Sequence, residues 1–243
     1  MLERFVSVLR SHRVLPLLLV LKAFVFGSLI ASTFFYSWFF GLFAIFWILF
    51  VYSRGAHRGR LAGSLITLCF VSFVFGGLSG GITGGILFFL LIGVKEFAFI
   101  RYDIVYYAVH AGLVFSLIFF LVGAGGSFLA AALVIAGILF FLLFREVISW
   151  MEHERHEGMH APVKKDLLAA GVILLAFEAL WVLAYLPLSP LHTALLVLFF
   201  VLVAEDFLFR FLRGGLSRGS ALRNITALIL LTLGIFGMTS WSP

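Results

Sequence analysis

Two ionisable side chains lie deep within apolar segments and are the first candidates for chemistry. Lys22 lies about eight residues into an apolar run near the N-terminus, and Glu178 lies about eleven residues into a later run. A helix rises about 1.5 Å per residue, so their depths differ by only ~4–5 Å. Charges at such depth are costly and mark functional sites or buried pairs. The sequence therefore predicts a Lys22–Glu178 pair, as a proton or ion relay or as a structural contact. The alternative is a lysine that snorkels towards the interface while Glu178 is protonated.

A second set of ionisable residues lies near the ends of the apolar runs, on the side that carries the basic loops. The set consists of Lys95, Glu96, Arg101, Asp103, His110, Glu146, Glu205, Asp206 and Arg210. Membrane proteins bury such groups against partners or beside a water-filled cavity. Two interpretations stay open: a polar vestibule that faces the cytosol, and a ring of salt bridges that anchors helix ends.

A histidine-rich segment contains a metal-binding pattern. His156-Glu157-Gly158-Met159-His160 matches HExxH, which on a helix places two imidazoles one turn apart for zinc, with the glutamate as general base. Over these five residues it resembles the zincin metalloproteases. Gly158 and the following Pro162 oppose the required helix, and no third ligand is evident. The interpretations are a catalytic zinc site, a regulatory metal or pH-sensing loop, and a solvated helix end. We expect the last.

An acidic pair in a late apolar run suggests a different hydrolase. Glu205 and Asp206 are followed by Arg210, four positions after the second acid. This resembles the first motif of the CAAX-protease-like intramembrane endopeptidases, which implies acidic residues that activate water for peptide hydrolysis. The chain departs from that family because the second acid is aspartate, Phe211 replaces the usual glycine, and no histidine lies downstream.

Glycines recur at four-residue spacing in the middle of the first half. One string consists of Gly76, Gly80 and Gly84, and another, one residue on, consists of Gly77, Gly81 and Gly85. Small residues four apart let helix backbones approach closely. The strings predict either a hinge that lines a substrate path, or an outer turn followed by close helix packing.

Nine apolar segments must position these residues. The chain has 243 residues, of which 63% are hydrophobic and 12% are charged. A helix needs about 20 apolar residues to cross a bilayer. The segments are 14–32, 35–53, 61–77, 81–99, 104–123, 127–148, 167–186, 190–211 and 224–241.

The distribution of lysine and arginine gives the orientation. Of the 17 basic residues, all except Lys22 lie at the N-terminus or in every second loop, and the alternate loops carry no charge. Basic loops face the cytosol. The sequence thus predicts an all-α, polytopic transmembrane bundle of about nine spans, with the N-terminus cytosolic and the C-terminus outside. Residues 1–243 form one membrane domain, with an interfacial helix at 1–13 and a cytosolic loop rich in His and Glu at 149–166.

Several functions are excluded by the same observations. The low charge content excludes a soluble enzyme, and the basic loops explain the net charge of +6 without nucleic acid. We expect no retinal, because no lysine follows Lys165 in a late span. We expect no haem, because His110 and His192 lie near opposite faces, and we expect no zinc.

We therefore expect a multi-pass protein of the cell (inner) membrane with a cytosol-facing polar cavity for a small solute, ion or lipid, as in a transporter or channel. One alternative is an intramembrane hydrolase that uses 156–160 or Glu205 and Asp206, and another is a scaffold subunit without chemistry. The expected partners are the lipid bilayer and such a small ligand, and the chain is compatible with an oligomer.

Overall fold

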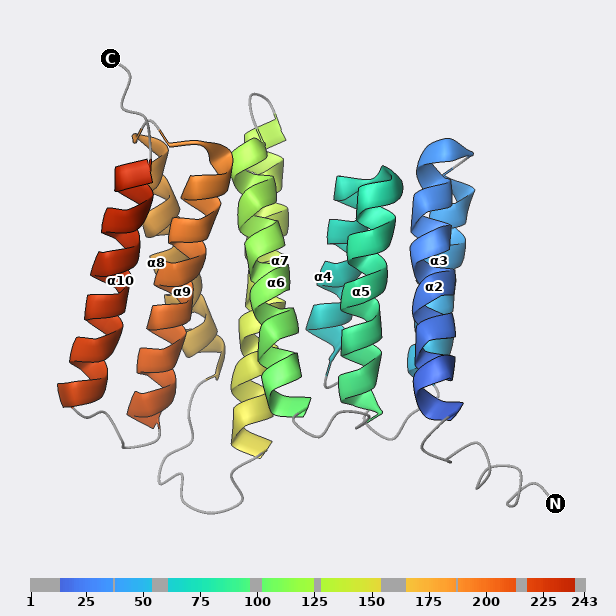
Figure 1. The fold of residues 1–243 in the computed structure, drawn as a ribbon, viewed down its shortest axis with the longest axis horizontal. Helices are drawn as coiled ribbons and strands as arrows, with labels where there is room; N and C mark the ends of the chain where they lie inside the picture. Colours follow the sequence, from blue (N-terminus) through green and yellow to red (C-terminus); the bar gives the residue numbers. More distant parts are fainter. Residues whose placement is uncertain are drawn as a thin grey trace. The chain divides into compact units, whose positions relative to one another are not determined.

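The structure is a computed structural model that describes residues 14–36, 38–53, 61–96, 102–124, 128–153, 165–186, 188–212 and 218–238. Every regular element within these ranges is a helix (Figure 1). The helices are α2 (Val14–Phe35), α3 (Phe39–Ser53), α4 (Ala62–Phe75), α5 (Gly77–Lys95), α6 (Tyr102–Gly123), α7 (Leu129–His153), α8 (Lys165–Ala184), α9 (Pro190–Leu212) and α10 (Arg218–Met238).

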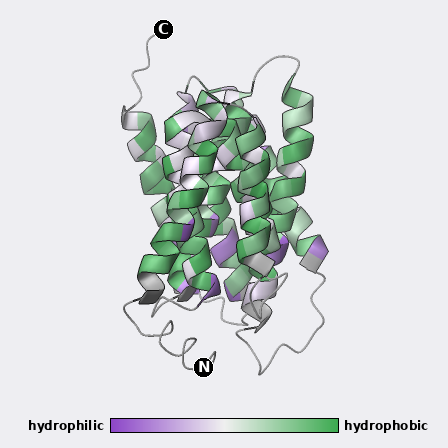
Figure 2. Ribbon diagram, turned by 90° about the vertical axis from the view of Figure 1, so that its right-hand side faces the viewer, coloured by the Kyte–Doolittle hydropathy of each residue, from purple (hydrophilic) through white to green (hydrophobic). Residues whose placement is uncertain are grey.

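The helices have the length and composition of membrane spans. Six of those described, namely α2, α5, α6, α7, α8 and α9, are long and apolar enough to cross a bilayer, and Figure 2 shows their hydrophobic colouring. The apolar stretches of α3, α4 and α10 are shorter. The all-helical membrane class is confirmed. The count of nine spans and the sides of the two termini stay predictions.

The chain reverses direction between α4 and α5 within one residue. Gly76 and Gly77 have φ angles of +49° and +59°, a region that residues with a Cβ rarely adopt. The helix break therefore falls at Gly76, and α5 begins four residues earlier than the sequence pattern predicts. These two glycines form the turn, and a Cβ at either would meet nothing closer than 3.7 Å.

Several sequence predictions concern segments in or near the basic loops. The loop expected at 149–166 is shorter, because α7 continues to His153 and α8 begins at Lys165. No helix breaker precedes Gly158, so the helical stretch of α7 has no reason to end at 149. The interfacial helix at 1–13, the HExxH segment at 156–160 and Arg101 lie outside the described residues.

The helices form two compact units, Met1–Leu113 and Val114–Pro243. The single membrane domain expected over residues 1–243 stays a prediction. In the first unit α2 packs most extensively on α5, and α4 also packs on α5, against an adjacent face. In the second unit each helix from α7 to α10 packs on the next helix in the chain.

Each unit has its own apolar core. In the first, Phe26 of α2 and Phe88 of α5 are fully buried, and their ring centroids lie 4.6 Å apart. In the second, Phe140 and Phe144 of α7 stack with centroids 5.9 Å apart, one helical turn from each other. These contacts fix the helix faces on which the polar residues lie.

Candidate functional site: a groove and a charged cluster

The α2–α5 pair is held at backbone contact by small residues. A Cβ added to Gly81 would lie 2.6 Å from the carbonyl oxygen of Gly27, and one added to Gly27 would lie 2.7 Å from that of Gly81. A Cβ added to Gly85 would lie 3.4 Å from the carbonyl oxygen of Ala23, a looser contact on the same face of α5. Hence the string Gly81–Gly85 faces α2, as small residues four apart allow.

The other glycine string faces α4. A Cβ on Gly84 would collide with the hydroxyl of Ser72, and one on Gly80 would lie 2.9 Å from the carbonyl oxygen of Ser72. Ser72 is itself buried. The adjacent strings thus let α5 pack closely against two helices at once.

A groove runs along the exposed surface of the α2–α5 pair, beside this backbone contact. Its volume is about 400 Å³. The small residues Gly27, Ala31, Gly81 and Gly85 line it together with larger apolar side chains. The groove opens sideways, since Phe24, Leu78, Ile82 and Ile86 on its rim are exposed. A second apolar groove of about 460 Å³ lies between α7 and α8.

Lys22 forms an ion pair with Glu96, which differs from the partner that matched depths had suggested. The Nζ atom of Lys22 lies 2.7 Å from Oε1 of Glu96, and the side chains are 21% and 28% exposed. Lys22 lies eight residues, or about 12 Å, above Val14 at the start of α2. Its flexible stem reaches back to Glu96, the C-cap residue directly after α5, as snorkelling lysines do.

The surroundings of this pair are also polar. Trp47 of α3 donates its Nε1–H to the backbone oxygen of Lys22 at 3.1 Å. Lys95 donates from Nζ to the backbone oxygen of Val51 at 3.1 Å. Three helices therefore meet at this charged cluster, which we define as Lys22, Glu96, Lys95 and Trp47.

Glu178 lies in the second unit on an exposed face of α8. It is thirteen residues, or about 20 Å, from Lys165 and six residues, or about 9 Å, from Ala184. Measured from the observed helix starts, its depth differs from that of Lys22 by ~7–8 Å, more than the sequence estimate.

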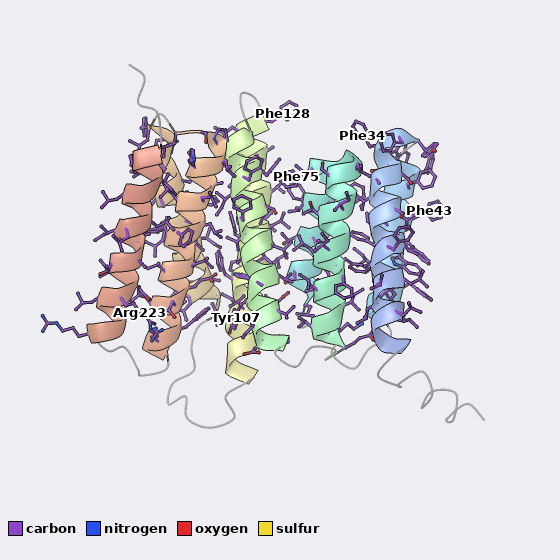
Figure 3. The ribbon with its side chains drawn as sticks, in the orientation of Figure 1. Phe34, Phe43, Phe75, Tyr107, Phe128 and Arg223 are labelled. Carbon is purple, nitrogen blue, oxygen red and sulfur yellow. The ribbon has the colours of Figure 1, made fainter. Side chains whose placement is uncertain are left out.

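A second polar cluster joins α9 and α10. Arg210 donates from Nε to Oδ2 of Asp206 at 2.6 Å, one helical turn away. Asn224 of α10 donates to the same oxygen from Nδ2. Arg223, on the exposed face of α10, is labelled in Figure 3. The carboxylate of Asp206 thus binds two donors, which opposes a role as a free base that activates water.

The remaining candidates are distributed over several helices. His110 of α6 and Glu205 of α9 are buried, as is Glu146 of α7, and each takes part in an interaction. Asp103 lies in the first turn of α6 and is half-buried. Among the described residues no three His, Cys, Asp or Glu side chains form a group that could hold a metal ion.

Sequence reasoning missed Trp47 and Asn224. A usable signal existed for Asn224, because Asp206 lies six residues before the end of α9 and Asn224 lies six residues after the start of α10. Equal distances from one loop place two residues at the same depth in a helical hairpin. Trp47 binds a backbone oxygen, which no residue pattern reveals.

The fold and these sites were compared with known proteins. No protein-family model matches the chain, and no curated protein or solved structure matches it.

Proposed function

We propose that this integral membrane protein binds an amphipathic, lipid-like molecule that enters sideways from the bilayer. The observation that supports this is the α2–α5 groove, whose volume of about 400 Å³ falls within the usual range of ligand sites. Acyl chains surround a membrane span, so a laterally open apolar groove meets this ligand class without an aqueous path.

The residues within the groove favour an apolar chain as its occupant. Glycine and alanine side chains leave a hollow that larger side chains of α2 and α5 border. The close backbone contact at Gly27 and Gly81 prevents the two helices from sliding together to close it. Ser28, at the exposed edge, is a polar side chain in an otherwise apolar lining.

The charged cluster favours a polar head on the same ligand. Val20 and Phe89 line the groove on the same helices as Lys22 and Glu96. Glu96 lies seven residues, or about two turns, beyond Phe89, and Lys22 reaches it through their ion pair. With two lysines and one glutamate, the cluster carries net positive charge, which suits an anionic headgroup at the interface.

Other functions have less support from the geometry. A transporter of a hydrophilic solute or ion requires a polar cavity, whereas both grooves described here are apolar. A hydrolase at Glu205 and Asp206 requires a free carboxylate, whereas Asp206 binds Arg210 and Asn224.

Photolabelling in native membrane vesicles tests the proposal. A phospholipid with a diazirine in its acyl chain should label α2 and α5 at the groove. Ser28→Phe fills the groove and should reduce this labelling at least fivefold. Ser79→Phe, at an exposed serine of α5 outside the lining, is the matched control and should label as the wild type does. Equal labelling of all three proteins, each with unchanged thermal stability, would disprove lipid binding in the groove.

A further inference from the structure

The exposed side of α8 carries a regular stripe of residues. Its spacing alternates between four and three residues, the spacing of a helix that packs along its length on another helix at a shallow angle. Each member of the stripe is exposed. The stripe consists of Leu167, Gly171, Leu174, Glu178 and Trp181 of α8, followed by Tyr185 directly after the helix.

The burial of α8 agrees with an unoccupied helix-packing face. Of the six described helices that are long enough to span a membrane, α8 is the least buried, with 17% of its apolar window inside the protein. Gly171 lies on the stripe, and a Cβ added there would meet nothing within 4 Å. A glycine in open space leaves room for a second backbone to approach.

Glu178 is the residue that lipid alone does not accommodate. It lies about 9 Å inside the outer end of α8, a distance that a glutamate side chain does not span. Within the part of the chain that the structure describes, it has no hydrogen-bond or ion-pair partner. A carboxyl group surrounded by hydrocarbon needs a hydrogen-bonding partner.

From these observations we propose that a second copy of this chain packs on the α8 stripe and brings two Glu178 carboxyl groups together. In a two-fold dimer whose axis follows the membrane normal, the two α8 helices run parallel and each residue meets its own copy at equal depth. Carboxyl groups suit such a contact, because a protonated one donates a hydrogen bond and its partner accepts it.

Symmetry explains why a second copy fits better than an unrelated helix. A foreign helix would need a polar residue at the depth of Glu178 together with small and large residues that match the stripe. The second copy supplies the carboxyl at that depth automatically. A single polar residue within such a seam also fixes the register of the two helices. This inference does not depend on the proposed lipid groove, which lies in the other unit.

Cysteine crosslinking in native membranes tests the dimer. Cys69 is the only cysteine, so Cys69→Ser gives a clean background. Leu174→Cys introduces a thiol one turn from Glu178, and oxidation should give a disulfide-linked species of twice 27.0 kDa. Leu230→Cys on α10 is the matched control, because Leu230 and Leu174 are exposed to a similar extent, 64% and 60%. It should give little product.

A second substitution tests the role of the carboxyl group. In the Leu174→Cys protein, Glu178→Gln keeps a donor and an acceptor and should retain the crosslink. Glu178→Leu should lower the crosslinked fraction about three- to tenfold, as expected for an interhelical hydrogen bond in a membrane. The dimer is excluded if folded Leu174→Cys protein gives no product, equal product to Leu230→Cys, or a product with another protein. An undiminished crosslink in Glu178→Leu would exclude the carboxyl contact.

Discussion

The two units bring their helices together by opposite routes. In the first, the closest pair is α2 and α5, which are separated in the chain by two other helices. Its ion pair joins Lys22 to Glu96, 74 residues apart. In the second, neighbouring helices pack in chain order, and Asp206 binds residues 4 and 18 positions away. The first unit therefore depends on contacts that form between distant segments.

The glycines show the same contrast at atomic scale. Gly27 and Gly81 are needed because each lies against a backbone oxygen. In the second unit, Gly137 leaves ordinary van der Waals space, with the ring of Phe177 at 3.7 Å, and Gly171 faces open space. Substitution of glycine by alanine is therefore expected to be destabilising at the helix contact of the first unit and tolerated in the second. The free energies of unfolding of such variants measure the difference.

The largest loss of stability is expected for a substitution at the α2–α5 contact. Gly81→Ala places a methyl group 2.6 Å from a backbone oxygen that cannot rotate away. Overpacking of this kind costs about 1–3 kcal/mol. The matched change Gly234→Ala, in α10 of the second unit, meets no neighbour and should be neutral or stabilising by up to about 1 kcal/mol, the difference in helix propensity. Unfolding in mixed detergent micelles measures the free energy of unfolding of both variants. An equal loss of stability in the two would contradict the expected difference between the units.

A smaller effect is expected at the Lys22–Glu96 pair. Lys22→Met leaves Glu96 without its ion-pair partner, which should cost about 1–2 kcal/mol because the pair is only partly buried. The double variant Lys22→Met, Glu96→Gln should recover most of this loss. The comparison with Lys22→Met, Glu178→Gln identifies the partner, because the two changes in that variant should be additive. A double-mutant cycle on unfolding free energies checks this, and coupling to Glu178 instead of Glu96 would contradict the observed pair.

The smallest effect is expected at the α9–α10 cluster. Asp206→Ala removes an acceptor for Arg210 and Asn224, but the side chains of Asp206 and Arg210 are 39% and 32% exposed. Exposed pairs contribute little, so the expected loss is about 0.5–1 kcal/mol. Arg145 and Asp166, an even more exposed pair, provide the control through Asp166→Ala. If Asp206→Ala lowers the free energy of unfolding by more than Lys22→Met does, the expected ranking of the two polar clusters is contradicted.

The sequence predicted features that depend on composition or local spacing. The helical membrane class followed from the long apolar runs, and the two glycine strings marked the helix that packs on two neighbours. The break at Gly76 was misplaced because two adjacent glycines can reverse the chain without a loop. Residue type indicated a turn in this glycine-rich stretch but not the residue at which it falls.

The partner of Lys22 could not be predicted by depth alone. Depth restricts partners to a layer of the membrane, and the sequence places several carboxylates near the ends of the apolar runs on the side of the basic loops. The choice of Glu96 depends on α2 lying beside α5, a non-sequential contact that Gly27 and Gly81 make possible. The Asp206 cluster, in contrast, joins adjacent helices, and equal distance from a loop is sufficient to place its members together.

The order of packing in the first unit also affects how the protein is made. Gly27 emerges from the ribosome 54 residues before Gly81, with which it makes its closest backbone contact. At roughly 5–20 residues per second, this interval lasts about 3–10 s. During that time α2 must remain in the bilayer with its glycine face covered by lipid, while α3 and α4 are inserted. Docking of α5 then displaces that lipid, so assembly of the first unit waits for α5 rather than proceeding by stepwise addition of each helix to the previous one.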